Sequence, residues 1–135
     1  MNVIADTCVW SMVLRHKGKP VARVRNELES LILDHRIQMI GPIRQEILSG
    51  IRNQEQFDKL QEYLDPFPDW PLETADYIEA ARYCNICRSE GVQGSNTDFL
   101  ICAVSARNRF SIFTTDKDFA RFARHLPIFL HPISL

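Results

Sequence analysis

Short apolar runs alternate along this chain with stretches of helical periodicity. Four apolar runs have the length of buried strands: residues 3–5, 37–40, 111–114 and 128–130. Apolar positions recur at helical spacing between them, in residues 8–14, 21–34, 43–48, 57–64, 75–86, 99–104 and 117–123. Strands that alternate with helices predict an α/β fold in three layers, with a short parallel sheet flanked by helices on both faces.

Capping and breaking residues set the predicted ends of these helices. Gly50 closes a short helix that begins at Ile43, which places Glu46 in the first turn. Thr74 is the predicted N-cap of a long helix that Gly91 ends. The connections include a basic stretch, residues 15–20, and a segment with three prolines, residues 66–71, which allows at most a short edge strand.

Size and composition indicate a single globular domain spanning residues 1–135. Of the 135 residues, 45% are hydrophobic and 24% are charged, and the formal net charge is −1. The chain therefore lacks the overall basic character that draws a protein to nucleic acid, and any such contact must use local patches. The sequence has no signal-peptide pattern, no membrane-spanning stretch and no disulfide framework. We therefore expect a cytoplasmic protein.

Four acidic residues from distant segments are predicted to meet at one edge of the sheet. Asp6 and Asp116 follow apolar strand runs directly, whereas Glu46 and Asp98 are placed in the first turns of helices. In a parallel sheet, each strand ends at the carboxyl edge and the next helix begins there, so ligand sites collect at that edge. We expect the four carboxylates to face one crevice.

Carboxylates that lie this close repel one another, so a cation that neutralises them explains the arrangement economically. Oxygen ligands without a converging set of histidines or cysteines favour Mg²⁺ or Mn²⁺ over zinc. A water bound to such a cation has a lowered pKa and can attack a phosphodiester. The pattern therefore favours a metal-dependent nuclease.

Each acid also has a simpler interpretation that the sequence leaves open. Glu46 and Asp98 could complement helix dipoles, an effect worth about 0.3 to 1 kcal/mol. Asp6 and Asp116 could be solvated loop residues, although both follow apolar runs directly.

In order along the chain, the four acidic segments resemble the motifs of the PIN domain, and specifically those of VapC-type toxins of toxin–antitoxin pairs. The matching segments are residues 3–7, the Glu46 helix, residues 98–103 and residues 114–119. The resemblance implies a Mg²⁺- or Mn²⁺-dependent endoribonuclease that cleaves a transfer RNA or a ribosomal RNA loop and so inhibits translation. It assigns Asp6, Glu46, Asp98 and Asp116 to the metal site.

The same resemblance implies supporting residues and protein partners. Thr7 and Thr114 fall where this family has hydroxyls beside the acids, and Asp118 is either a supporting acid or part of the first turn of the last helix. The family also implies a homodimer and a cognate antitoxin that wraps around the toxin and places a basic side chain in the acidic crevice.

Several further features bear on partners and on competing functions. Arg44 and Lys117, beside the acidic edge, are candidates to hold RNA phosphates. The exposed face of helix 21–34, together with the stripe Phe57, Leu60 and Leu64, is predicted to line an antitoxin groove, although both stripes could instead be core. The Cys84–Cys87 pair has CxxC spacing but no second ligand pair, so we interpret both as packing residues.

Two other enzyme or signalling classes fit the acids poorly. A haloacid-dehalogenase-type phosphatase needs a second Asp two residues after the first, where this chain has Cys8. A phospho-receiver domain needs its acceptor Asp after the third strand and a late Lys, whereas these acids recur at other elements. A non-catalytic PIN-like module that binds RNA or protein remains the alternative.

Overall fold

The computed structural model describes residues 1–15 and 19–133, and within them seven helices and four strands alternate. The strands are β1 (Val3–Ala5), β2 (Ile37–Gln38), β3 (Ser111–Phe113) and β4 (Phe129–Leu130). The helices are α1 (Thr7–Arg15), α2 (Lys19–Leu33), α3 (Gly41–Leu48), α4 (Gln54–Leu64), α5 (Thr74–Ser89), α6 (Asn96–Asn108) and α7 (Asp118–Phe122). Part of the basic connection predicted at 15–20 lies outside the described residues.

The four strands form one parallel sheet in the order β2-β1-β3-β4. Ile4 of β1 pairs with Gln38 on one side and with Ile112 on the other, so β1 is central. The proline-containing connection contributes an isolated parallel bridge between Met39 and Asp69 and no regular strand. The predicted α/β fold with a parallel sheet is therefore confirmed.

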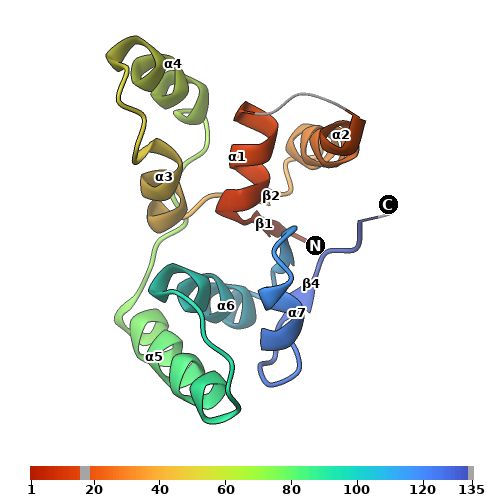
Figure 1. Cartoon of the computed structure of the whole chain (residues 1–135), viewed down its shortest axis with the longest axis vertical. Coiled ribbons are helices and arrows are strands. Elements are labelled where there is room, and N and C mark those ends of the chain that lie inside the picture. The colour runs from red at the N-terminus through yellow and green to blue at the C-terminus, as the bar shows by residue number, and fades with distance from the viewer. Residues whose placement is uncertain (16–18, 134–135) are drawn as a thin grey trace.

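Helices cover the sheet on both sides. Figure 1 shows α1 and α2 on one side of the strands and α6, backed by α5, on the other. Helix α6 is buried from Phe99 to Ser105, and strand β1 is wholly buried. Because apolar residues surround α6, it forms the centre of the core, as its almost continuous apolar sequence predicts. Within the described residues, no helix is long and apolar enough to cross a membrane.

Two predicted helix starts are wrong. Helix α3 begins at Gly41 rather than near Ile43, with Pro42 in its first turn, where a missing N–H costs nothing. Glu46 therefore lies in the second turn of α3. Helix α5 has Glu73 rather than Thr74 as its N-cap, and the backbone N–H of Glu73 donates to Asp76 Oδ2 at 2.9 Å.

Helix α5 buries one of two faces that carry apolar residues. Ile78 and Ile86 are 50% and 43% exposed, whereas Ala80, Tyr83 and Cys87 are buried against the core. Apolar residues occur on both faces of α5, so periodicity alone could not choose between them. Cys84 and Cys87 are free thiols, and the latter is part of the core.

The apolar stripe of α2 belongs to the core, which was the alternative to a groove-lining role. Its buried members are Val21, Val24, Leu28 and Leu31. In α4, Leu64 is likewise buried, whereas Phe57 and Leu60 are half-buried. Of this predicted stripe, Leu64 therefore belongs to the core, and Phe57 and Leu60 keep part of their surface exposed.

Candidate functional site

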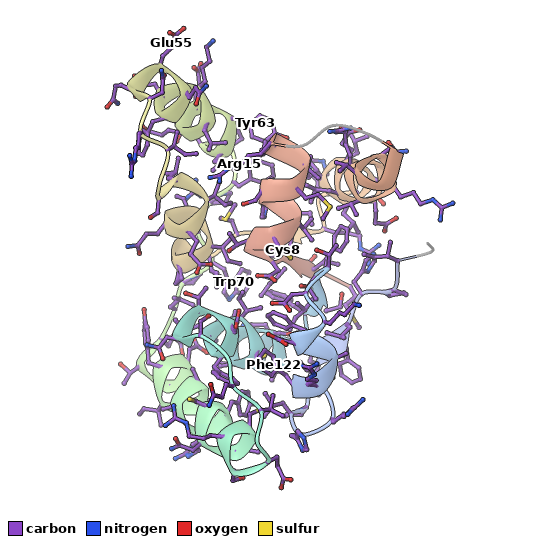
Figure 2. The ribbon with its side chains drawn as sticks, in the orientation of Figure 1. Cys8, Arg15, Glu55, Tyr63, Trp70 and Phe122 are labelled. Atoms are coloured by element: carbon purple, nitrogen blue, oxygen red, sulfur yellow. The ribbon has the colours of Figure 1, made fainter. Side chains whose placement is uncertain are left out.

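One cavity of about 610 Å³ brings the four predicted acids together. Its lining residues are Asp6, Thr7, Cys8, Pro42, Gln45, Glu46, Ser49, Thr97, Asp98 and Asp116. They come from the start of α1, from α3, from the first turn of α6 and from the segment after β3. Figure 2 shows Cys8 at the end of α1 that faces α6 and α7. The convergence follows from the parallel sheet, because β1 and β3 are neighbours whose carboxyl ends open on the same edge.

Asp6 is held at the centre of the cavity wall by three hydrogen-bond donors. Its Oδ1 accepts from the Thr7 N–H at 2.7 Å, and its Oδ2 accepts from the Thr114 hydroxyl at 2.9 Å and from the Cys8 thiol at 3.3 Å. The residue is only 5% exposed. This burial raises the pKa of Asp6 above its usual range despite those hydrogen bonds, and the negative charge of Asp116 adds to the rise.

Asp98 serves both as a helix cap and as part of the cavity. Its Oδ2 accepts from the Ser95 N–H at 3.0 Å, and its own N–H donates to the Ser95 hydroxyl at 3.1 Å, forming a capping box. Burial raises the pKa of Asp98, and the charges of Asp6 and Asp116 raise it further. The helix-cap interpretation and the site interpretation are thus compatible for this residue.

The remaining two acids are joined to the site by the two predicted threonines. The Thr7 hydroxyl donates to Glu46 Oε1 at 2.6 Å. The Thr114 hydroxyl, which donates to Asp6, also accepts from the Asp116 N–H at 3.0 Å. Thr7 therefore links α1 to α3, and Thr114 links β1 to the segment after β3.

Asp118 lies beside the cavity but does not line it. Its N–H donates to Asp116 Oδ1 at 2.9 Å, and its carboxylate pairs with Arg121 at 3.0 Å within the same short helix. These contacts agree with a role in the first turn of α7, which the sequence left open. Through its N–H, Asp118 also orients the Asp116 carboxylate.

The two predicted phosphate-binding residues have different surroundings. The guanidinium of Arg44 pairs with Asp69 at 3.0 Å and donates to the carbonyls of Leu64 and Phe67, so it ties α3 to the connection after α4. It does not line the cavity. Lys117 is exposed at the start of α7, next to Asp116. Contact of either residue with RNA stays a prediction, and the geometry favours Lys117.

Sequence reasoning missed Cys8 as a member of this site. Its thiol contacts Asp6, lies 3.5 Å from the Thr114 hydroxyl and accepts from the Thr115 hydroxyl at 3.3 Å. Burial and the charge of Asp6 raise the pKa of this thiol, which keeps it protonated as a donor. The sequence could have indicated Cys8, because a residue two positions after a strand-end acid lies in the first turn of the following helix and therefore close to that acid.

The donor set fits a hydrated divalent cation. Within residues 1–15 and 19–133, no three Asp, Glu, His or Cys side chains are grouped closely enough to form a complete protein cage for a metal. Mg²⁺, however, is usually held by one or two carboxylates while it keeps several waters. A roomy cavity with four carboxylates in its wall suits that mode of binding.

Comparisons with known proteins agree with this architecture. The family model of the PIN domain matches residues 3–125. No curated protein matches the sequence.

Solved structures share the fold at low sequence identity. FitAcB from Neisseria gonorrhoeae is 22% identical over 94% of this chain and 96% of its own, with a TM-score of 0.75. VapBC2 from Rickettsia felis, bound to a DNA fragment from its promoter, is 17% identical, with a TM-score of 0.72. The match covers 97% of this chain and 98% of the other chain. A chain of a toxin–antitoxin complex from Klebsiella pneumoniae is 14% identical, with a TM-score of 0.70. The match covers 99% of this chain and 100% of the other chain.

Proposed function

Because this chain belongs to the PIN domain family, we propose that it is a Mg²⁺- or Mn²⁺-dependent endoribonuclease, the toxin of a toxin–antitoxin pair. The observation that carries the proposal is the shared cavity, in whose wall lie Asp6, Glu46, Asp98 and Asp116. These acids come from four separate segments, and two of them are held with raised pKa values by burial and mutual repulsion. A cation relieves that repulsion, whereas capping or solubility explains only single members.

We assign a separate role to each group of residues in and beside this cavity. The four carboxylates would hold the cation, directly or through its coordinated waters. When bound, the cation would supply charge stabilisation and an activated water for hydrolysis of a phosphodiester. Thr7 and Thr114 hold the carboxylates of Glu46 and Asp6. Lys117, exposed beside Asp116, is placed to contact a phosphate of the RNA. The substrate class we propose is structured RNA of the translation machinery, a transfer RNA or ribosomal RNA loop.

The proposed partners are an antitoxin and a second copy of the chain, in the cytoplasm. The fold neighbours include complexes of toxins with antitoxins. A second cavity, of about 550 Å³, lies between the end of α1 and α4 and is lined by Leu14, Arg15, Ile51, Gln56, Lys59, Leu60 and Tyr63. Figure 2 shows Arg15 and Tyr63 near each other on these two helices. Its mixed apolar and basic lining suits an amphipathic antitoxin segment with acidic residues.

Incubation of the purified protein with total RNA tests the proposal, in Mg²⁺, in Mn²⁺ and in EDTA. We expect cleavage with either cation and none in EDTA. Asp98→Asn should abolish both cleavage and growth arrest while the protein stays folded, because the cation needs the carboxylate charge. Asp58→Asn, on the exposed surface of α4, is the matched control and should remain fully active.

A non-catalytic RNA- or protein-binding module predicts a different result. Such a protein would bind RNA equally well with and without a divalent cation and would leave it intact. Full toxicity of a folded Asp98→Asn variant would also contradict the nuclease proposal.

A further inference from the structure

Hydrogen bonding leaves the Asp6 carboxylate with little capacity for further ligands. A carboxylate offers about four lone-pair positions, two on each oxygen. The Thr114 hydroxyl and the Cys8 thiol both donate to Oδ2, at 2.9 and 3.3 Å. The Thr7 N–H takes one position on Oδ1, at 2.7 Å. One lone pair of Oδ1 therefore remains for a cation.

A directed chain of donors maintains this arrangement. The Thr115 hydroxyl donates to the Cys8 sulfur at 3.3 Å, which leaves the single thiol proton of Cys8 for an acceptor. The Thr114 hydroxyl uses its own proton in the hydrogen bond to Asp6, so the charged Asp6 carboxylate is the acceptor for the Cys8 thiol. Successive donors polarise one another and strengthen the last bond of the chain.

We propose that Cys8 is a positioning residue that makes Asp6 a single-oxygen ligand and thereby favours Mg²⁺ or Mn²⁺ over Ca²⁺. This inference rests on the proposed metal-dependent function. Mg²⁺ requires near-octahedral geometry and uses single carboxylate oxygens with several waters, whereas Ca²⁺ accepts more ligands and often binds both oxygens of one carboxylate. Together, the Thr114 hydroxyl and the Cys8 thiol occupy both lone pairs of Oδ2, which closes the two-oxygen mode at Asp6.

Substitutions at Cys8 separate hydrogen bonding from packing. Cys8→Ala removes the donor and frees a lone pair on Oδ2. Cys8→Ser keeps a donor of similar size at the same place. Cys84→Ala is the matched control, because this half-buried cysteine lies on α5 outside the acid-lined cavity. Circular dichroism and melting curves establish that each variant is folded.

Calorimetric titration of the metal-free proteins with Mn²⁺ and with Ca²⁺ gives the ratio of the two dissociation constants. Loss of an outer-shell partner typically changes metal affinity about 10- to 100-fold. We therefore expect Cys8→Ala to reduce the preference for Mn²⁺ over Ca²⁺ by about 10-fold. Cys8→Ser and Cys84→Ala should keep the ratio of the parent protein.

The possible outcomes distinguish this inference from the proposed function. An unchanged ratio in Cys8→Ala overturns the role of Cys8, and RNA cleavage by the parent with Mn²⁺ would leave the nuclease proposal standing. An equal loss in Cys8→Ala and Cys8→Ser overturns the hydrogen-bond argument, because a serine donor would then not replace the thiol. A parent protein that binds neither cation overturns both proposals.

Discussion

The Thr7 hydroxyl donates to Glu46 Oε1 at 2.6 Å, across 39 positions of the chain. Thr7 is the first residue of α1, and Glu46 lies in the second turn of α3. This bond fixes a flexible glutamate that would otherwise sample several rotamers in an open cavity. It also explains how Glu46 reaches the site although it is not in the first turn of its helix.

Thr7→Val should lower the rate of RNA cleavage by about 10-fold, the lower end of the effect of outer-shell partners on metal sites. The hydroxyl holds Glu46, whereas the Thr7 N–H that holds Asp6 is unchanged by this substitution. Single-turnover cleavage with Mn²⁺ measures the effect. Thr7→Ser, which restores the donor, should recover the rate. A Thr7→Val protein as fast as its parent would show that Glu46 needs no such support.

The Asp76–Arg107 pair offers a test of stability away from the cavity. Asp76 is 1% exposed on α5, and its two carboxylate oxygens accept from Arg107 Nε at 2.6 Å and Nη2 at 2.8 Å. Arg107→Gln leaves that carboxylate buried without its cation. We expect the free energy of unfolding at neutral pH to fall by about 2 kcal/mol, less than for a fully buried pair, because the Arg107 side chain is 33% exposed.

The cost of Arg107→Gln should shrink in acid. Burial alone would raise the pKa of Asp76, but hydrogen bonds from Arg107 and from the Glu73 backbone, with the guanidinium charge, hold it below its ordinary value of 3.8. A lowered folded pKa gives stability that is present at neutral pH and is lost as the pH falls through that pKa. Urea unfolding from neutral pH downwards measures this. Arg82→Gln, which removes the exposed pair with Glu79, should cost almost nothing at any pH.

The second cavity, a groove between α1 and α4, is the place where a substitution should weaken antitoxin binding and leave catalysis unchanged. Tyr63 lines this groove and is 48% exposed. Tyrosines are frequent binding hot spots, so Tyr63→Ser should weaken antitoxin binding by about 30-fold, or about 2 kcal/mol. RNA cleavage should not change, because the groove is separate from the acid-lined cavity.

Tyr77→Ser is the matched control, because Tyr77 is 53% exposed on α5, outside this groove. Binding of a fluorescently labelled antitoxin to each variant provides the measurement. Equal affinity of Tyr63→Ser and the parent would remove the groove as the antitoxin site.

The sheet and the convergence of the acids were predictable because both follow from local patterns and one topological rule. Each strand is a short apolar run, and parallel connection brings the ends of such runs to one edge. Asp6 and Asp116 were therefore placed correctly beside one another from sequence alone. The PIN domain resemblance is confirmed by the family match.

Other features depended on contacts that periodicity does not encode. Helix α3 begins at Gly41, before the predicted start at Ile43, because Pro42 is favourable in the first turn of a helix. The spacing of apolar residues in α5 does not identify its buried face, because such residues lie on both faces; the structure exposes Ile78 and Ile86. The contacts of Arg44 with Asp69 and two carbonyls join segments whose proximity only the folded chain reveals.

Asp6→Asn distinguishes a metal site from a structural acid by its effect on stability with and without metal. The pKa of Asp6 is raised by burial and by the charge of Asp116, so the folded state holds its proton more tightly than the unfolded state does. The favourable contribution is present below the unfolded pKa and is lost as the pH rises through the folded pKa, so at neutral pH the ionised group opposes folding. In EDTA at neutral pH, Asp6→Asn should therefore be as stable as the parent or more stable, because it removes the charge that opposes folding. Mg²⁺ or Mn²⁺ should reverse this order, because a cation that binds only the folded parent stabilises it by RT ln(1 + [L]/Kd). Melting curves of both proteins in EDTA and in each cation measure the two effects, and a destabilised variant in EDTA together with an unmoved parent midpoint in metal would make Asp6 a structural acid.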